Sequence, residues 1–432
     1  MVSGTALVIG GGITGMQAAL DIANAGFKVV LVEKTPSLGG RMLQFSQVFP
    51  TLDCPQCIGT PKMAEVGSHP NIRLMAYAEV VDVTGSAGRF RVKIKKKSRF
   101  VDTEKCTACG ECVRVCPVSL PNEWDLGLSQ RKAVYIPFAQ AVPTTYTIDK
   151  SEGGCIDCGE CETVCDAGAI NHEAQDEYEE IEAGAIVVAT GYEVFDARLK
   201  PEYGYGIYPN VITGLELERL DEAGGPTKGK IETNGQEPKN VVFIQCVGSR
   251  DKSVGVEYCS RVCCMYTAKQ ALYIKSKIPG AKVTACYLDM RAFGKGYEEF
   301  YERVQSEGVI YRRGVVSEVY KRGGKLVVRG EDTLLGEVYE EAADLVVLAV
   351  GLRPGKGTVE LSRMLNIPVG ADGFFLEAHP KLGPVETTTD GIYLAGCCQG
   401  PKDITDSVVQ GSAAAALACI KLASLEEQCV LP

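Results

Sequence analysis

Residues 5–16 read TALVIGGGITGM, an apolar run that passes directly into three closely spaced glycines. Gly10, Gly12 and Gly15 form the pattern G-x-G-x-x-G between a predicted strand and a predicted helix. In such a unit the first glycine permits a tight turn, and the second lets the backbone approach a pyrophosphate. The third lets the helix pack closely on the strand. The stretch therefore predicts the start of an α/β domain with a parallel sheet and a dinucleotide site.

The residues that follow support the same interpretation. A helical pattern over 13–25 leads into a second apolar run at 28–32, as a βαβ unit requires. The free N–H groups at the start of this helix, at Ile13 and Thr14, are expected to face the phosphates. Glu33 ends the second strand, where a carboxylate can accept a hydrogen bond from a ribose 2′-OH.

Three later segments favour FAD over a nicotinamide dinucleotide, because they match contacts typical of flavoproteins with two dinucleotide-binding domains. Gly39–Arg41 follows the second strand, Ala189–Gly191 closes a later strand, and Gly391–Gly396 resembles the segment that reaches the ribitol. These flavoproteins usually carry an aspartate after that last glycine, and this chain has Cys397. The further FAD contacts expected are Lys34, Gly39, Gly40, Arg41, Val80, Thr190, Gly191, Gly396 and Cys397.

Nineteen cysteines are present, and clustered cysteines in a reducing compartment usually indicate metal or redox chemistry. Eight of them fall in residues 98–173, a segment with little apolar periodicity that is expected to be inserted into a larger domain. They form two runs of C-x2-C-x2-C-x3-C, the bacterial-ferredoxin spacing, in which the fourth cysteine of each run binds the other cluster. One predicted [4Fe–4S] cluster is held by Cys106, Cys109, Cys112 and Cys165, and the other by Cys116, Cys155, Cys158 and Cys161.

A glycine-rich turn for NAD(P)H is missing from the place where such flavoproteins carry one. Gln245 and Val247 stand where its first two glycines would be, and a valine side chain would block the approach of a phosphate. NAD(P)H binding at the usual site is therefore expected to be lost. Four cysteines gather there instead, and their spacing favours a third cluster over buried free thiols or a disulfide between the adjacent pair. These are Cys246, Cys259, Cys263 and Cys264.

Four stretches of the chain resemble the family of heterodisulfide reductase A subunits: 243–251 (FIQCVGSRD), 258–266 (YCSRVCCMY), 291–296 (RAFGKG) and 396–404 (GCCQGPKDI). The resemblance covers essentially all residues. It implies an α/β, thioredoxin-reductase-like flavoprotein with two dinucleotide-binding domains and an inserted two-cluster ferredoxin domain. It also implies one FAD and a third [4Fe–4S] cluster at the four cysteines just named. The family places a lysine near the flavin, and Lys269 matches it as the expected catalytic residue, with an ordinary helix lysine as the alternative.

The resemblance implies an oxidoreductase component that relays electrons between partner redox proteins, and it leaves open whether electron pairs are split (bifurcation) or merged (confurcation). Full-length members carry an N-terminal cluster domain and a C-terminal ferredoxin pair, which this sequence lacks. It is similar to shorter relatives such as the A subunit of the quinone-interacting membrane-bound oxidoreductase. The implied partners are other subunits of such a complex, namely iron–sulfur subunits with or without a haem-binding membrane subunit.

Two competing functions remain open on the sequence alone. One is an NAD(P)H-dependent dithiol reductase that uses Cys54 and Cys57, and the other is a scaffold that keeps its cofactors for structure. Cys54 and Cys57 form a C-x-x-C pair that could be a redox dithiol, part of a cluster site completed by a partner, or plain buried thiols. The missing NAD(P)H turn counts against the dithiol reductase.

Charge and apolar patterning narrow the surroundings in which the chain works. The net charge of −10 argues against a nucleic-acid partner. The basic stretch 93–99 is interpreted as a solvated strand edge, with a docking patch for an acidic partner as the alternative. The three histidines, His69, His172 and His379, are interpreted as structural or surface residues. No apolar run reaches the roughly 18 residues of a membrane span, so a cytoplasmic location is expected, free or held at the membrane by partners.

These patterns divide the chain into five segments. Residues 1–97 and 174–236 are expected to form the two parts of an FAD-binding domain, with a closing segment at 385–432. Residues 98–173 form the ferredoxin insert. Residues 237–384 form a second Rossmann-like domain that carries the non-standard cluster site.

Overall fold

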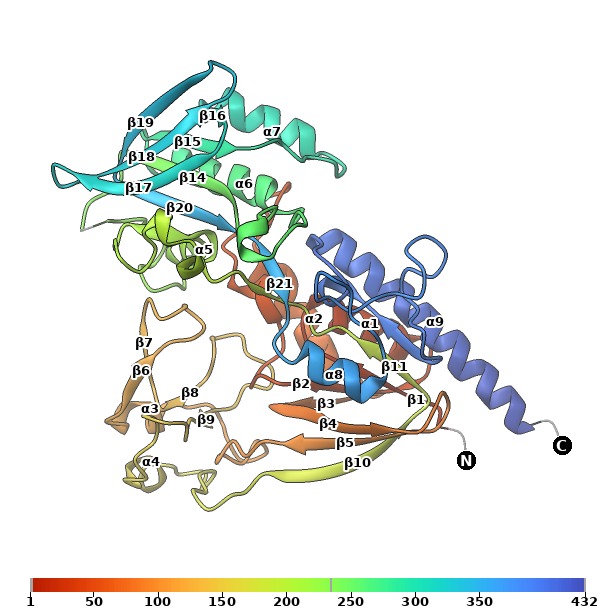
Figure 1. Ribbon diagram of the computed structural model, residues 1–432. Coiled ribbons are helices and arrows are strands. Elements are labelled where there is room, and N and C mark those ends of the chain that lie inside the picture. The colour runs from red at the N-terminus through yellow and green to blue at the C-terminus, as the bar shows by residue number, and fades with distance from the viewer. Residues whose placement is uncertain (1–2, 234, 431–432) are drawn as a thin grey trace.

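The central sheet of the first unit is parallel and contains the expected βαβ start (Figure 1). The computed structural model describes residues 3–233 and 235–430. In the order of the sheet, the strands are β22 (Ile392–Leu394), β11 (Ala185–Val188), β1 (Thr5–Ile9), β2 (Lys28–Glu33) and β3 (Ile72–Ala76). Segments from both ends of the chain and from beyond the insert therefore share one sheet.

Both faces of this sheet are covered, because successive residues of its strands point to opposite sides. Ala6 and Val8 pack into a core with the helices α1 (Ile13–Asn24), α2 (Pro55–Ser68) and α9 (Ile404–Val430). Leu7 and Ile9 pack into a second core on the other face. The antiparallel strands β4 (Ala78–Thr84), β5 (Phe90–Lys96) and β10 (Glu177–Ala183) cover that core, together with α8 (Thr358–Leu365).

Helix α9 is longer than the 407–423 segment predicted from its apolar pattern. It begins at Ile404 because Asp403 accepts a hydrogen bond from the backbone N–H of Asp406, at 2.8 Å, and so caps the first turn. Within the described ranges it is the one helix whose length and composition would let it cross a membrane, a test that core helices of soluble proteins also pass. The expectation of a chain without its own membrane span stays a prediction.

The insert leaves the first unit at the end of β5 and returns at the start of β10. These strands are antiparallel neighbours, and Lys96 faces Glu177, so the two ends of the insert lie side by side. Its elements are short: α3 (Glu111–Val115), β6 (Ser119–Pro121), β7 (Gln130–Lys132), β8 (Val134–Tyr135), β9 (Thr147–Ile148) and α4 (Glu160–Thr163). In Figure 1 the insert lies at the lower left, below α5.

The basic stretch 93–99 is not a strand edge, and that interpretation is wrong. Strand β5 is the middle strand of its sheet, with β10 on one side and β4 on the other. Lys95 lies 2.8 Å from Asp176, and Lys96 lies 2.6 Å from Glu179. The lysines are paired with acids of neighbouring segments of the same chain, which removes the main reason to expect an acidic partner there.

The second unit is also an α/β sandwich (Figure 1). Its parallel sheet has the order β13 (Val211–Thr213), β20 (Leu345–Val350), β14 (Asn240–Val247), β15 (Lys282–Tyr287) and β16 (Ile310–Arg313). Three helices accompany it: α5 (Gly214–Asp221), α6 (Cys263–Lys277) and α7 (Tyr297–Ser306). The strands β17 (Val316–Arg322), β18 (Lys325–Asp332) and β19 (Glu337–Ala343) form a separate antiparallel sheet.

The two units are joined by a pair of antiparallel strands, β12 (Tyr192–Val194) and β21 (Leu352–Pro354). This crossing lies further out than the expected boundaries at 236/237 and 384/385. Strand β13 already belongs to the second sheet, and Leu365 and Phe375 pack into a core of the first unit. The local pattern missed both because it does not show which sheet a short strand or helix joins.

Short 3-10 segments complete the secondary structure. They are η1 (Gly40–Gln44), η2 (Ala197–Leu199), η3 (Pro201–Tyr203), η4 (Lys252–Val254) and η5 (Gly396–Cys398). η1 and η5 flank the glycine turn that begins at Gly10, because Gly39 donates a backbone hydrogen bond to Gly11 and Gly396 packs against Thr14.

Candidate functional site

A large cavity opens beside the glycine turn, with a volume of about 930 Å³. This volume is in the upper range of sites for small molecules and cofactors. Gly10, Gly12, Ile13 and Thr14 line one end of it, and Glu33 lies beside them. The cavity runs on between the two units, where residues of α5, α6, α8 and the start of α9 complete the wall.

The glycine turn has the shape that a phosphate-binding turn needs. Gly10 has φ +111°, and a Cβ there would collide with the carbonyl of Ala189. A Cβ on Gly15 would collide with the carbonyl of Gly10, so the helix can approach the strand only without it. At Gly12 the nearest atom to an added Cβ is 4.0 Å away, which leaves its backbone facing open space. A diphosphate fits this concave backbone at the N-terminus of α1.

Glu33 is buried and fixed by backbone donors at the rim of the cavity. Its Oε2 accepts from the N–H of Gly11 at 2.6 Å, and its Oε1 accepts from the N–H of Thr35 at 2.7 Å. Each carboxylate oxygen has a second lone pair, so the side chain retains acceptor capacity for a ribose hydroxyl.

The other residues expected to contact FAD fall into two groups. Several line the cavity directly: Lys34, Gly40, Arg41, Val80, Thr190, Gly191 and Cys397. Gly15, Gly39 and Gly396 lie behind that wall and support it. The hydroxyl of Thr190 is buried at the wall and has no hydrogen-bond partner among the described residues. It is therefore free to bond a ligand.

The sequence did not reveal that the insert also lines this cavity. Its contributing residues are Asn122, Glu123, Trp124, Tyr135, Pro137 and Phe138. Trp124 stacks on Phe138 with ring centroids 4.2 Å apart, and its indole N–H is buried without a partner in the described parts of the chain. Trp124 is the only tryptophan of the chain, and that rarity was the one available signal.

Lys269 lies on α6 at the wall of the same cavity. It is buried, with Nζ 2.8 Å from a carboxylate oxygen of Glu218 and 2.7 Å from the carbonyl of Gln47. Burial lowers the pKa of Lys269, and the charge of Glu218 acts in the opposite direction. The structure therefore places a buried lysine–glutamate pair beside the cavity, and its role toward a flavin stays a prediction.

The eight cysteines of the insert gather around its two short helices. Burial, followed by the charges of Cys106 and Cys109, raises the pKa of the Cys112 thiol to about 12. Burial, followed by the charge of Cys155, raises the pKa of Cys161 to about 11, and Cys158 and Cys116 add to it. The fourth cysteine of the first run is thus close to the second run, as the ferredoxin assignment requires. Thiols that crowd each other in this way fit a metal that displaces their protons.

The four cysteines of the second unit also converge. Cys246 lies near the end of β14 with φ +61°, while Cys263 and Cys264 begin α6. Burial, and then the charge of Cys264, raises the pKa of Cys246 to about 12, and the charge of Cys259 adds to it. All four are free thiols, so the alternative of a disulfide between Cys263 and Cys264 is not observed.

This second cysteine site adjoins the cavity and occupies the place of an NAD(P)H turn. Val262 and Tyr266, on either side of the Cys263–Cys264 pair, line the cavity. Gln245 is buried, and its Oε1 lies 3.6 Å from the Cys264 sulfur. A Cβ on Gly248 would collide with the ring of Phe195. No room therefore remains at this turn, within the described residues, for a phosphate to approach the backbone.

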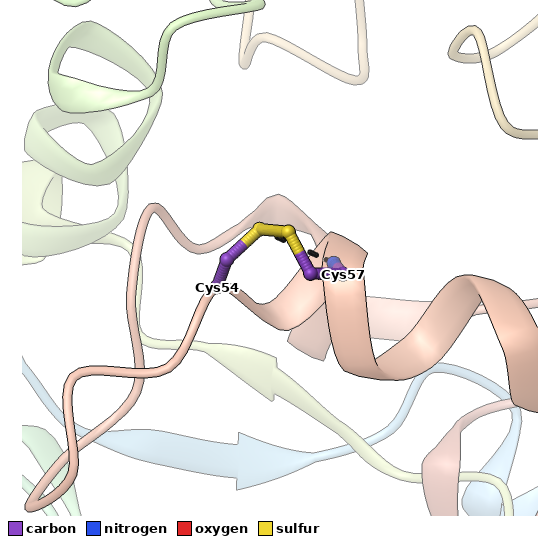
Figure 2. The surroundings of a disulfide bond; sticks show 2 residues. All are labelled: Cys54 and Cys57. Carbon is purple, nitrogen blue, oxygen red and sulfur yellow. Dashed lines mark hydrogen bonds between the residues drawn. A yellow bond between two sulfur atoms is a disulfide. The ribbon is translucent and has the colours of Figure 1, made fainter.

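Cys54 and Cys57 are joined by a disulfide at the start of α2 (Figure 2). Cys54 caps the helix, because its sulfur accepts a hydrogen bond from the N–H of Cys57 at 3.2 Å. Cys57 is exposed and Cys54 is half-buried. The interpretation as plain buried thiols is therefore wrong.

Comparison with known families and structures agrees with this geometry. Residues 6–103 match the family model of FAD dependent oxidoreductases, and residues 99–119 match that of the 4Fe-4S binding domain. The fold is similar to thioredoxin reductase from Lactococcus lactis, at 16% identity and a TM-score of 0.55 over 98% of this chain and all of that one. Thioredoxin reductase from T. acidophilum matches with 14% identity and a TM-score of 0.52 over 98% of this chain and all of that one.

Fold and sites together define an FAD-dependent oxidoreductase of thioredoxin-reductase fold that also binds iron–sulfur clusters. The chain is 56% identical over 421 residues to the A subunit of the H(2):CoB-CoM heterodisulfide,ferredoxin reductase of Methanothermobacter marburgensis. It is 55% identical over 430 residues to an iron-sulfur A subunit of the CoB--CoM heterodisulfide reductase of Methanopyrus kandleri. It belongs to the family of heterodisulfide reductase A subunits. The alignments cover 96% and 98% of the chain, and the chain spans 64% and 65% of these two relatives.

Proposed function

We propose that this chain is the flavin- and cluster-bearing electron-transfer component of a heterodisulfide-reductase-type complex. One observation carries the proposal: a single cavity is lined by the glycine turn, by the insert and by α6. Gly10 represents the first of these, Trp124 the second and Tyr266 the third. An FAD seated on the glycine turn would therefore lie between the two cysteine-bearing regions.

The proposed cofactor load is one FAD and three [4Fe–4S] clusters. Bound FAD exchanges electrons in pairs and iron–sulfur clusters exchange them singly, which lets such a protein connect two-electron and one-electron partners. The glycine turn and Glu33 anchor the dinucleotide, and the cysteine runs hold iron. Lys269 is proposed to stabilise negative charge on the reduced ring, because its buried ammonium faces the cavity wall with Glu218 as its partner.

The chain's own residues act by binding, orienting and insulating. The apolar walls, such as Val350 and Leu352 at the crossing between the units, exclude water from the cavity. Glu218 fixes the ammonium of Lys269, and Tyr266 donates to the carbonyl of Val350 at 2.8 Å beside the second cysteine site. No described residue arrangement suggests a hydrolytic triad, and the blocked turn at Gln245 disfavours NAD(P)H as a direct donor.

The relatives' names supply the class of complex. Those proteins are described as subunits of reductases that act on the CoB-CoM heterodisulfide, some with ferredoxin. We infer that this chain works beside iron–sulfur subunits of a comparable complex, with or without a haem-binding membrane protein. This role implies a cytoplasmic location, free or at the inner face of the membrane through those partners. Whether electron pairs are split or merged is decided by partners outside this chain.

Anaerobic isolation tests the proposal directly. Iron, acid-labile sulfide and released flavin are measured together, and the expected ratio corresponds to three [4Fe–4S] clusters for each FAD. Dithionite should bleach the chromophores and produce the electron paramagnetic resonance of reduced clusters. NADH without partners should leave the spectrum unchanged. Rapid bleaching by NADH alone would favour the dithiol reductase, and protein without iron or flavin would end the proposal.

A further inference from the structure

His172 lies against a predicted cluster ligand, so its interpretation as a plain structural or surface residue is incomplete. Its Nε2 is 3.4 Å from the sulfur of Cys161, and its Nδ1 is 3.2 Å from Oδ1 of Asp157. The imidazole is 11% exposed, although it follows the second cysteine run near the end of the insert. The ring is therefore held between a sulfur and a carboxylate.

The surroundings fix the orientation of this ring. Lys150 lies 2.5 Å from the same Asp157 oxygen and donates to the backbone carbonyl of His172 at 3.0 Å. The Lys150 ammonium also lies 4.6 Å from the centre of the Phe100 ring. One lysine thus ties down both the carboxylate and the backbone of the histidine. The sulfur of Cys155, the carboxylate of Asp157 and the ring of His172 lie within 4.8 Å of one another.

The chemistry of a cluster assigns the donor in this contact. A cysteine that binds iron is a thiolate, which accepts hydrogen bonds and has no proton to give. The contact between His172 and Cys161 then has the ring N–H as its donor. Hydrogen bonds to ligand sulfurs stabilise the reduced, more negative cluster and so raise its reduction potential.

We propose that His172 hydrogen-bonds the cluster held by Cys116, Cys155, Cys158 and Cys161 and raises its reduction potential. The inference rests on the proposed function, because it requires that cluster. His172 is a positioning residue: it acts on the electron affinity of the cluster through Cys161.

The other two histidines lie elsewhere, so the other cluster of the insert receives no such contact from the described residues. His69 bonds Asn24 and Asn71, and His379 bonds the backbone of the residues that follow it. Neither lies at a cysteine run. The pair of clusters is therefore built alike in ligand spacing and unlike in hydrogen bonding, which separates their potentials.

The first experiment compares potentials in the anaerobic holoprotein. His172→Phe keeps a planar ring without a donor, His172→Gln keeps an N–H donor, and His379→Phe is the matched control at an exposed histidine. Redox titration followed by electron paramagnetic resonance reports each cluster. In His172→Phe we expect one cluster to shift to a more negative potential, with a reduced-to-oxidised ratio about three- to tenfold lower at a fixed solution potential. His172→Gln should shift less, and His379→Phe should not shift.

A second experiment needs no substitution and covers the case in which a variant fails to assemble. The native protein is labelled with isotopic histidine, and pulsed resonance of the reduced clusters measures coupling to the histidine nitrogen. A weak coupling, carried through a hydrogen bond, is expected at one cluster. A coupling as strong as that of a bound ligand, or none at all, would overturn the proposal.

The two proposals fail in different ways. Protein without iron contradicts the proposed function. Fully loaded protein whose His172→Phe potentials equal those of the native protein contradicts only the role of His172.

Discussion

The insert and the second α/β unit present their cysteines in opposite ways. In the insert, Cys112, Cys116 and Cys161 are three of the nine buried residues of the local core. The regular elements around them are a few residues long. A core this small gives little apolar burial to offset the entropy of ordering the chain. The metal must therefore supply much of the stability of the insert.

In the second unit the fold comes first and the cysteines are placed on it. Cys263 and Cys264 begin α6, a helix of 15 residues that packs into a core containing Phe243, Leu272 and Val347. No cysteine is among the described residues of that core. The comparison teaches that the same ligand type can either build a structure or be carried by one, and the difference is measurable.

Removal of the clusters should have the largest effect, and the effect should be confined to the insert. After anaerobic chelation we expect the amides of β6 to β9 to exchange quickly, because metal binding and folding are coupled where the core is small. The amides of β14 and α6 should stay protected. Hydrogen–deuterium exchange with mass spectrometry reads both regions in one sample. Equal loss of protection in the two regions would break the comparison.

Lys269→Met tests the second unit from within. The substitution leaves the carboxylate of Glu218 buried, 2% exposed, without its cation. Removing one partner of a buried ion pair typically costs about 3–5 kcal/mol, so the free energy of unfolding of this unit should fall by that order. Denaturant unfolding measures it, and the iron content of the insert should not change.

The matched control for this change is the double variant Lys269→Met/Glu218→Gln. It removes the unpaired charge and should recover part of the lost stability. If the single variant were as stable as the native protein, the buried pair would have no structural role. Lys269 would then have to be judged on the flavin potential alone.

Gly10→Ala should act on the dinucleotide and leave both cysteine regions intact. The new methyl group would meet the carbonyl of Ala189, and φ is +111°. Gly26→Ala is the control, because Gly26 also has positive φ, +99°, but nothing described lies within 4 Å of its added Cβ. We expect the dissociation constant for FAD to rise by about two orders of magnitude in Gly10→Ala and to change little in the control.

The single tryptophan gives the measurement. Trp124 lines the cavity, so FAD binding should quench its emission, and titration of flavin-depleted protein yields the dissociation constant. An emission that does not respond to FAD would place the flavin away from the insert. The two regions would then lack the connection on which the proposed function depends.

Local spacing predicted the parts of this molecule in which neighbours in sequence act together. The turn at Gly10 and the two cysteine runs of the insert follow from short patterns whose geometry is nearly fixed. The parts that failed depend on distant pairing. Nothing near Lys95 indicates that β5 has a strand on each side, and nothing near Val211 indicates which sheet β13 joins.

The candidate site divides along the same line. The cavity contacts of Trp124 and Phe138 arise because the insert folds back on the first unit. The contact of His172 with Cys161 arises because the chain after the second run returns to it. Such contacts are set by tertiary structure, and periodicity carries no information about them.

The smallest effect is expected at the neck of the insert, where β5 and β10 enter and leave it. Asp176 pairs with Lys95 at 2.8 Å and accepts from the N–H of Ser98 at 2.9 Å. The hydrogen bond from Lys95, followed by that from Ser98, holds the pKa of Asp176 below its usual range. Asp176→Asn keeps an acceptor for Ser98 and removes only the charge. Because the pair is partly exposed, we expect the free energy of unfolding to change by less than about 1 kcal/mol, and less still at high salt. Thermal unfolding at two salt concentrations measures this change. A larger loss that exposes the insert to protease would mean that charge at the neck, and not metal in the core, holds the insert in place.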